Sequence, residues 1–436
     1  MYKLGACLLV IAFLSGCALY SDVAIQPLRL LPSDIERGAD IEDAVKRADY
    51  LRAVELAPVA DARTKPNVNE LAALGEAFLA CGRYDDARRR LRAALDLRPF
   101  HTTYAQIAWS LSQVEYLDNN YTSSLEWAQL AAQNGLSIRR WHIDYLSSLS
   151  GVPVYRFRGA ATARTTLRFG RPSVPRLDVK VNGKDAEAIL DTGAVVSIVS
   201  ARLAERLAVK SLGDYEGTFY GLLGEPIQVR FGLVESLEIG DIIVENVPVA
   251  IMPDEKMRFL ITEKEKREFR MDLLLGANLL KEFRIALDFD TNRALFTKLT
   301  ARDRQPAANQ NLFMNGFRPH VHGAVNRHAW FLFVLDTGSE VTFLNEAQMF
   351  RLPIAQNFGP RAHSALLQGL GGSKKRGAKV EDVQIGLDKW AGVFKTLPMY
   401  TADERESSAG IIGENFLRHF NVTIDFGRMR LDLVRR

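Results

Sequence analysis

Two aspartates stand in closely matching surroundings, and their side chains could carry out acid–base chemistry. Asp191 lies in "ILDTGAVVSIV" and Asp336 lies in "FVLDTGSEVTFL", 145 positions further along the chain. Each follows an apolar run that predicts a buried strand, and each precedes Thr-Gly. A carboxylate between buried segments is costly to desolvate unless a partner or a reaction requires it there. Two such carboxyl groups that meet would share one proton and could act together as acid and base.

The same order of sequence features occurs twice, once around each aspartate. Each Asp-Thr-Gly comes after a strand and a turn, at Asn182-Gly183 and at Val325-Asn326, and is followed by a helix-like segment and a Gly-rich hairpin candidate. Each copy then ends in a matching stretch, "LLLGANLLKEFRIALDFD" and "GIIGENFLRHFNVTIDFG". The shared order predicts an internal duplication over Phe157–Arg436, with the join near Arg302–Asn311.

Two copies of apolar-Asp-Thr-Gly-Ala/Ser, each followed by apolar-apolar-Gly, resemble the retropepsin-like aspartic proteases. The duplicated form resembles the two-lobed arrangement of pepsin-like enzymes within one chain. The resemblance implies two mainly-β lobes, at 157–301 and 312–436, with Asp191 and Asp336 as a catalytic dyad. It also implies an aspartic endopeptidase that needs no cofactor and no metal, and a monomer that completes its own active site.

The resemblance also assigns roles to the residues that follow the aspartates. The threonines would cross-brace the two loops by hydroxyl-to-backbone hydrogen bonds, and the glycines would let the loops approach each other. The active-site loop residues expected in this support are Thr192, Gly193, Ala194, Thr337, Gly338 and Ser339. The two loops differ at the position after Asp-Thr-Gly, where the first has Ala194 and the second has Ser339. A Ser339 hydroxyl that donates to Asp336 would lower the pKa of that carboxyl and leave the shared proton on Asp191.

The Gly-rich hairpins are candidate flaps that close over an extended polypeptide substrate and exclude water. Tyr220-Gly221 resembles the flap tyrosine of pepsin-like enzymes, and Gln368-Gly369 stands at the corresponding place in the second copy. The two flaps are therefore not equivalent. His320 and His322 alternate along a predicted strand, so we expect them on an outward polar face and assign them no metal.

The N-terminal residues are typical of a secretory signal peptide. Lys3 precedes the apolar run Leu4–Leu14, which is too short to span a bilayer. The sequence Leu14-Ser15-Gly16-Cys17 resembles the lipobox of bacterial lipoproteins. It implies a signal peptide at 1–16, a lipid attached at Cys17 and a tether at 17–32. We therefore expect a periplasmic protein held to a membrane, and Ala18 favours the outer over the inner membrane. No intramolecular disulfide can form after processing, because Cys81 alone remains.

Residues 33–152 carry helical periodicity. The stretch "LAALGEAFLACGRYDDARRRLRAALDLRP" resembles a tetratricopeptide repeat, and a weaker copy follows with Tyr121, Ala128 and Ala131. The helices around Ile41–Leu56 and Ile138–Leu149 would complete the stack. The role of this region stays open between docking of a protein partner or substrate and a spacer between membrane and catalytic region.

Composition supports a globular, multidomain chain of 436 residues, with 47% hydrophobic and 25% charged residues. A net charge of +4 without a long basic run argues against nucleic-acid binding. The predicted fold is an all-α helical-repeat region followed by two mainly-β acid-protease lobes. An alternative function is a catalytically silent peptide-binding lipoprotein that uses the same cleft and the helical repeats. Two intact Asp-Thr-Gly tripeptides favour the enzyme, because a binding module has no need of two acids.

Overall fold

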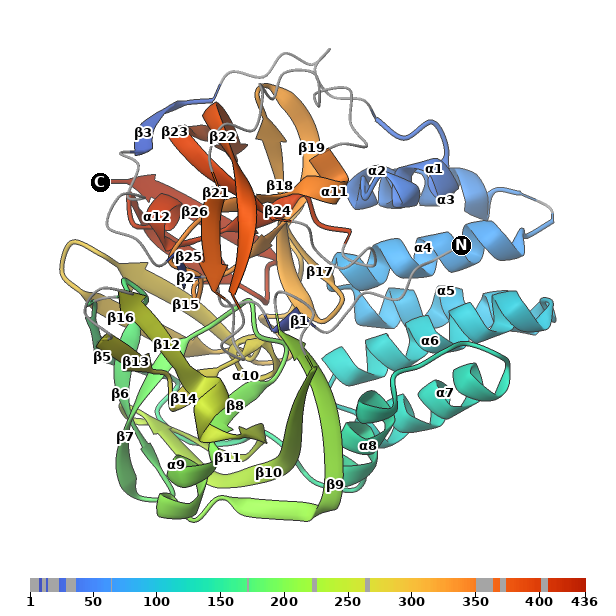
Figure 1. Ribbon diagram of the computed structural model, residues 1–436. Coiled ribbons are helices and arrows are strands. Elements are labelled where there is room, and N and C mark those ends of the chain that lie inside the picture. The colour runs from blue at the N-terminus through green and yellow to red at the C-terminus, as the bar shows by residue number, and fades with distance from the viewer. Residues whose placement is uncertain are drawn as a thin grey trace.

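The computed structural model describes residues 8–9, 13–14, 23–28, 37–63, 65–170, 172–221, 226–262, 267–349, 364–368, 374–400 and 407–436. A stack of helices lies along one side of two β regions (Figure 1). We call residues 156–298 the first β region and residues 312–435 the second β region. This order of a helical region and then mainly-β sheets confirms the coarse fold class predicted above. No helix within these ranges is long and apolar enough to cross a membrane.

The helical region packs its helices in sequential neighbours. Its elements are α1 (Ile41–Lys46), α2 (Tyr50–Glu55), α3 (Ala57–Asp61), α4 (Val68–Ala80), α5 (Tyr84–Asp96), α6 (His101–Leu117), α7 (Tyr121–Gln133) and α8 (Arg140–Leu149). Helix α4 packs on α5, and α6 packs on α7. A Cβ atom on Gly75 would lie 2.5 Å from Cγ of Leu91, so the first pair requires a glycine at this contact. Ala128 and Ala131 are fully buried in the second pair.

The first β region forms most of one large sheet. Its strands are β4 (Arg156–Gly159), β5 (Thr162–Arg168), β6 (Arg176–Val181), β7 (Lys184–Leu190), β8 (Ser197–Ser200), β9 (Lys210–Gly221), β10 (Pro226–Ile239), β11 (Ile242–Met252), β12 (Arg258–Thr262), β13 (Arg267–Arg270), β14 (Leu273–Leu275), β15 (Phe283–Asp288) and β16 (Arg293–Lys298). Its short helices are α9 (Ala201–Arg206), η2 (Asp254–Met257) and α10 (Ala277–Leu280).

The second β region has a similar order of elements, but its described residues contain no counterpart of η2, β12 and β13. It contains β17 (Leu312–Asn315), β18 (Arg318–Val325), β19 (His328–Leu335), β20 (Phe343–Asn345), α11 (Glu346–Met349), β21 (Ser364–Gln368), β22 (Lys374–Leu387), β23 (Trp390–Tyr400), β24 (Gly410–Ile412), α12 (Glu414–Leu417), β25 (Phe420–Asp425) and β26 (Arg430–Arg435). Strand β14 pairs parallel with β7 and antiparallel with β8, and β24 pairs in the same way with β19 and β20. Strands β16-β15-β25-β26 are neighbours in one sheet, so they join the two regions.

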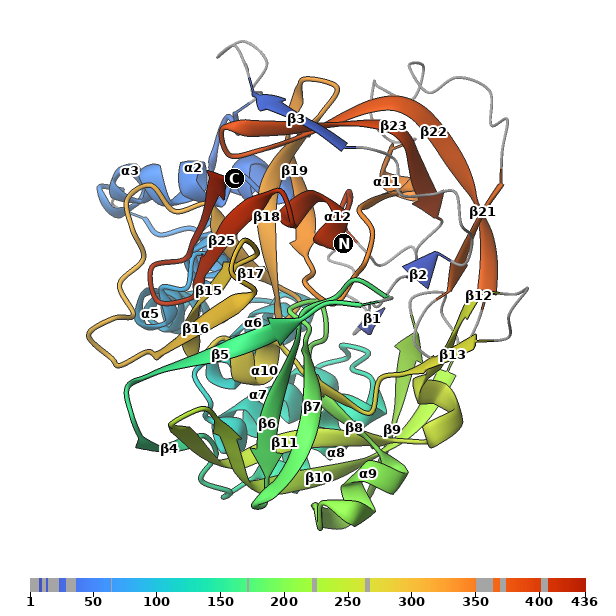
Figure 2. The ribbon, with the colours of Figure 1, turned by 90° about the vertical axis from the view of Figure 1, so that its left-hand side faces the viewer.

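Three short strands come from the N-terminal part of the chain. They are β1 (Leu8–Leu9), β2 (Phe13–Leu14) and β3 (Val23–Pro27). Strand β3 pairs antiparallel with β23 and so becomes part of the second β region. Figure 2 shows β1 and β2 between the two β regions.

Two details differ from the sequence-based expectations. The turn between β18 and β19 has positive φ at Asn326 (48°) and Arg327 (71°), one position later than predicted. The expectation that His320 and His322 face outward is wrong. His320 is 1% exposed, and Nε2 of His322 lies 2.8 Å from the carbonyl oxygen of Ala48. The helical region covers this face of β18, and a strand covered on both faces has no outward polar side.

Candidate active site

Both aspartates lie at the ends of buried strands. Asp191 directly follows β7 and Asp336 directly follows β19, and both side chains are 0% exposed. The backbone N–H of Asp191 donates to the carbonyl of Leu275 at 3.0 Å, and that of Asp336 donates to the carbonyl of Ile412 at 3.1 Å. Strands β14 and β24 therefore fix the position at which each strand ends and each active-site loop begins.

The two threonines form a reciprocal set of hydrogen bonds between the loops. The N–H of Thr192 donates to Oγ1 of Thr337 at 3.2 Å, and the N–H of Thr337 donates to Oγ1 of Thr192 at 3.1 Å. Each hydroxyl then donates across to the other loop, to the carbonyls of Leu335 at 2.6 Å and Leu190 at 2.7 Å. Four buried hydrogen bonds thus hold together two loops that lie far apart in the sequence.

The two glycines allow the aspartates to meet. A Cβ atom on Gly193 would lie 2.3 Å from Cγ of Asp336, and one on Gly338 would lie 2.5 Å from Cγ of Asp191. Real Cβ atoms do not approach other atoms so closely, so each glycine makes room for the carboxyl group of the opposite loop. The structure therefore brings Asp191 and Asp336 to one place, between the two β regions.

Backbone donors hold one oxygen of each carboxyl group. Oδ1 of Asp191 accepts from the N–H of Ala194 at 2.9 Å. Oδ1 of Asp336 accepts from the N–H groups of Gly338 at 2.9 Å and Ser339 at 3.0 Å. Both Oδ2 atoms are buried, and neither has a hydrogen-bond partner within the part of the protein that the structure describes. These two oxygens are therefore the ones available to a reacting water and a substrate carbonyl.

Burial makes both carboxyl groups harder to ionise than an exposed aspartate. Burial raises the pKa of Asp191 to about 7, although the N–H of Ala194 stabilises its charged form. Burial and the neighbouring charge of Asp191 raise the pKa of Asp336 well above its usual range. The two groups are coupled, so at neutral pH the pair as a whole holds one proton.

The role predicted for the Ser339 hydroxyl is wrong. The hydroxyl of Ser339 donates to the carbonyl oxygen of Val341 at 2.8 Å, so it does not donate to Asp336. A hydroxyl group can donate only one hydrogen bond, and this one goes to the main-chain carbonyl of Val341. Ser339 reaches the aspartate only through its backbone N–H, as Ala194 does on the other side.

Arg318, which was absent from the predicted site, is a buried cation that acts on both aspartates. Arg318 begins β18 and is 2% exposed. Its positive charge lowers the pKa of Asp191 and of Asp336, against the effect of burial. The available signal was a single arginine in the otherwise apolar stretch "LFMNGFRPHV".

A polar support that recurs behind each loop was also absent from the predicted site. In the first β region, Oδ1 of Asn278 accepts from the N–H of Ser197 at 2.8 Å, and the Ser197 hydroxyl accepts from the N–H of Gly276 at 2.9 Å. In the second, Oδ1 of Asn415 accepts from the N–H of Thr342 at 2.7 Å, and the Thr342 hydroxyl accepts from the N–H of Gly413 at 3.0 Å. Polar residues at matching positions of both copies were the signal.

Two of the flap candidates lie on a hairpin of the first β region. Tyr220 and Gly221 end β9, and β9 pairs antiparallel with β10. The corresponding hairpin of the second β region is β21–β22. Gly369 lies outside the described residues, and so does the lipid-attachment candidate Cys17. Strand β1 pairs parallel with β9 at Tyr220 and Gly221, while β2 pairs antiparallel with β21.

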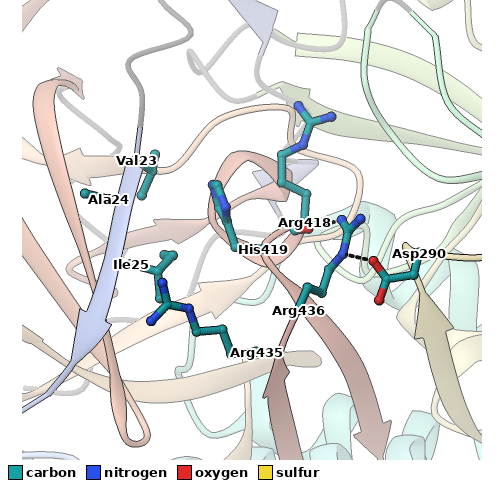
Figure 3. Close-up of a pocket in the computed structure, with 8 residues that line it drawn as sticks. All are labelled: Val23, Ala24, Ile25, Asp290, Arg418, His419, Arg435 and Arg436. Atoms are coloured by element: carbon teal, nitrogen blue, oxygen red, sulfur yellow. Dashed lines mark hydrogen bonds and ion pairs between the residues drawn. The ribbon is translucent and has the colours of Figure 1, made fainter.

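A separate pocket of about 470 Å³ is lined by residues of β3, by Asp290 of the first β region and by residues of the second, and contains neither aspartate (Figure 3). Arginines and a histidine dominate its lining, but their charges are partly taken up within the protein. Arg436 donates to Asp290 at 2.6 Å and to the carbonyl of Arg418 at 2.7 Å. Figure 3 also shows Arg435 pointing toward Ile25, so the cations do not converge on one point.

Comparison with known proteins gives a family match over part of the chain and matches among solved structures. Residues 177–282 match the family described as "gag-polyprotein putative aspartyl protease", a span that contains Asp191 but not Asp336. No curated protein matches the sequence significantly. A matching solved structure is the crystal structure of a retropepsin-like aspartic protease from Rickettsia conorii, with 17% identity and a TM-score of 0.24, covering 33% of this chain and 96% of that one. The family match supports an aspartyl protease in the part of the chain that carries Asp191.

Proposed function

We propose that this protein is an aspartic endopeptidase whose water is activated by Asp191 and Asp336. The observation that carries the proposal is the meeting of two fully buried carboxyl groups across Gly193 and Gly338. The ionised member of the pair takes a proton from water as the water attacks the peptide carbonyl, and the protonated member donates to the carbonyl oxygen. The C–N bond of the resulting diol then breaks as the first carboxyl group passes its proton to the leaving nitrogen, and a hydroxyl of the diol returns a proton to the second.

The substrate in this proposal is a polypeptide in an extended conformation. The pairing of β1 with β9 and of β2 with β21 supports this, because main chain of the protein itself takes strand positions against both hairpins. Strand addition of this kind uses backbone hydrogen bonds and leaves side-chain pockets to choose the sequence. In the proposed mature protein those two segments leave with the signal peptide, which clears the hairpin edges for substrate.

We further propose that both active-site halves descend from one duplicated unit and that a lipid on Cys17 anchors the mature chain in the periplasm, favouring the outer membrane. Five positions separate Cys17 from β3, which is bound into the second β region. An extended tether of that length reaches no more than about 20 Å. The catalytic region would then lie close to the membrane surface.

A cleavage assay tests the function. Purified protein is incubated with an unfolded polypeptide, and fragments are counted by mass spectrometry for the wild type and for Asp191→Asn. The proposal expects fragments with the wild type and almost none with the variant. Binding of the polypeptide without cleavage by the wild type would favour the silent peptide-binding lipoprotein instead.

A further inference from the structure

Helix α8 of the helical region lies beside β9 and contacts both β regions (Figure 1). Its neighbouring residues Trp141 and His142 contact different β regions, Trp141 the first and His142 the second. The ring of Trp141 meets Phe219 of β9 edge to face at 5.0 Å, whereas the ring of His142 stacks on Phe317 of the β17–β18 turn at 5.4 Å. Burial lowers the pKa of His142 to about 3, so this ring is neutral and packs as an aromatic side chain.

The contact with β9 lies next to the flap tyrosine candidate. The guanidinium carbon of Arg139 lies 4.4 Å from the centre of the Tyr220 ring. A Cβ atom on Gly217 would lie 2.9 Å from Cβ of Trp141, so β9 carries a glycine where the helix approaches most closely. Because successive residues of a strand point to opposite faces, Trp141 and Arg139 contact β9 through opposite faces.

A second connection leads from the helical region to the support of the first active-site loop. The hydroxyl of Tyr121, on α7, lies 3.5 Å from the hydroxyl of Tyr155. The Tyr155 hydroxyl accepts from Nδ2 of Asn278 at 2.9 Å, and Asn278 holds Ser197. A spacer between membrane and enzyme would need neither of these connections.

We propose that Arg139 and Trp141 are positioning residues for the flap strand β9, so that the helical region sets how the first β region binds its substrate. Arg139 holds the ring of Tyr220 by a cation–π contact, and Trp141 holds the strand from its other face. The consequence for substrate binding rests on the proposed endopeptidase function. The positioning of β9 by Arg139 and Trp141 does not rest on that function.

The experiment compares four variants of the full chain. Arg139→Gln removes the cation over Tyr220, and Arg139→Lys keeps a cation there. Trp141→Leu removes the aromatic contact with Phe219. Arg140→Gln is the matched control, because the neighbouring Arg140 side chain is 87% exposed and pairs with Asp144 at 2.9 Å.

Hydrogen–deuterium exchange of residues 216–221 measures the strand, and kcat and KM measure its effect on substrate. We expect exchange in Arg139→Gln to rise about threefold to tenfold, the range that one cation–π contact supports. KM should rise by a similar factor with a smaller change in kcat, Arg139→Lys should recover most of both, and Arg140→Gln should match the wild type. The pH–rate profile should keep its shape, because the dyad is untouched.

Failure of the inference and failure of the proposed function give different results. Unchanged exchange of residues 216–221 in both Arg139→Gln and Trp141→Leu would overturn the positioning role, even in an active enzyme. An equal rise in the exchange of residues 216–221 in Arg139→Gln and Arg140→Gln would also overturn the positioning role, since it would reflect a general loosening of α8. A wild type that cleaves nothing would end the endopeptidase proposal, and the exchange measurement would still decide the role of Arg139.

Discussion

Gly193 and Asp336 lie so close that a single added methyl group on the glycine would fall 2.3 Å from Cγ of the aspartate. Gly193→Ala should therefore push the Asp336 carboxyl out of place while leaving the strands intact. A displacement of about 1 Å can cost on the order of 100-fold in rate. We expect kcat/KM to fall by about this factor or more.

Gly170→Ala is the control for this variant. A methyl group there would meet only the end of the Arg176 side chain, which can move away. Near-ultraviolet circular dichroism should be unchanged in both variants. Wild-type turnover in Gly193→Ala would refute the close approach of the two loops.

Asp191→Asn and Asp336→Asn should each remove nearly all activity, because the two carboxyl groups act as a unit. The double variant should be no worse than either single one by more than a small factor. Single-turnover cleavage of a fluorogenic peptide measures this. Substantial activity in either single variant would contradict a shared proton.

Asp191 should also make stability depend on pH. Its folded pKa, about 7, lies above its usual value, so the folded state binds the proton more tightly than the unfolded state does. The free energy of unfolding should therefore fall as pH rises from about 4 to about 7. Asp191→Asn removes the free-energy cost of ionising this buried carboxyl group. It should raise the free energy of unfolding at pH 7.5 by on the order of 2–4 kcal/mol and change it little at pH 4.

Urea unfolding at the two pH values measures this difference. Asp185→Asn, at an exposed carboxylate that pairs with Lys180, is the matched control. Equal effects of Asp191→Asn at both pH values would show that burial does not raise the pKa of Asp191.

The pH–rate profile should place the acid limb of kcat/KM near pH 7, since one carboxyl group of the pair must be ionised and the pKa of Asp191 is about 7. The observed values belong to the pair as a whole. Arg318 lowers the pKa of both aspartates, so Arg318→Met should move the acid limb to higher pH by about half a unit to one unit. Arg318→Lys should restore it.

Ser339→Ala is the matched control, because the Ser339 hydroxyl donates to Val341 and not to the dyad. Its acid limb should stay in place. A profile that moves with Ser339→Ala and not with Arg318→Met would reverse our account of which neighbours tune the pair.

Cys17→Ser tests the proposed anchor. The substitution should block lipidation and shift the protein from the membrane fraction to the soluble fraction, or leave it unprocessed with its signal. Fractionation followed by mass spectrometry of the N-terminus measures both outcomes. A wild type found mostly in the soluble fraction would contradict the anchor. The catalytic region should fold in either case, because Thr192 and Thr337 hold the two active-site loops together.

The sequence predicted the features that local pattern and duplication control. Apolar runs before Asp191 and Asp336 predicted the strands β7 and β19, and Asn182-Gly183 predicted the turn between β6 and β7, where φ is 51° and 76°. The meeting of the two aspartates was expected from the family resemblance, because spacing along a chain does not by itself bring two loops together.

What the sequence could not predict depends on contacts between distant segments. The Ser339 hydroxyl has several acceptors within reach, and only the folded loop shows that Val341 takes its proton. His322 alternates with apolar residues as an outward side chain would, yet α1 and α2 bring Ala48 against it. The helical periodicity of α8 indicates a buried face but not that β9 and Phe317 cover it.

The reciprocal hydrogen bonds of Thr192 and Thr337 have a consequence for the order of folding. They join loops separated by 145 positions, and closing so long a loop has a large entropic cost before any contact rewards it. Neither threonine can form its pair until both β regions have folded. In the proposed endopeptidase, a newly made chain would therefore become able to cleave its substrate only late in folding.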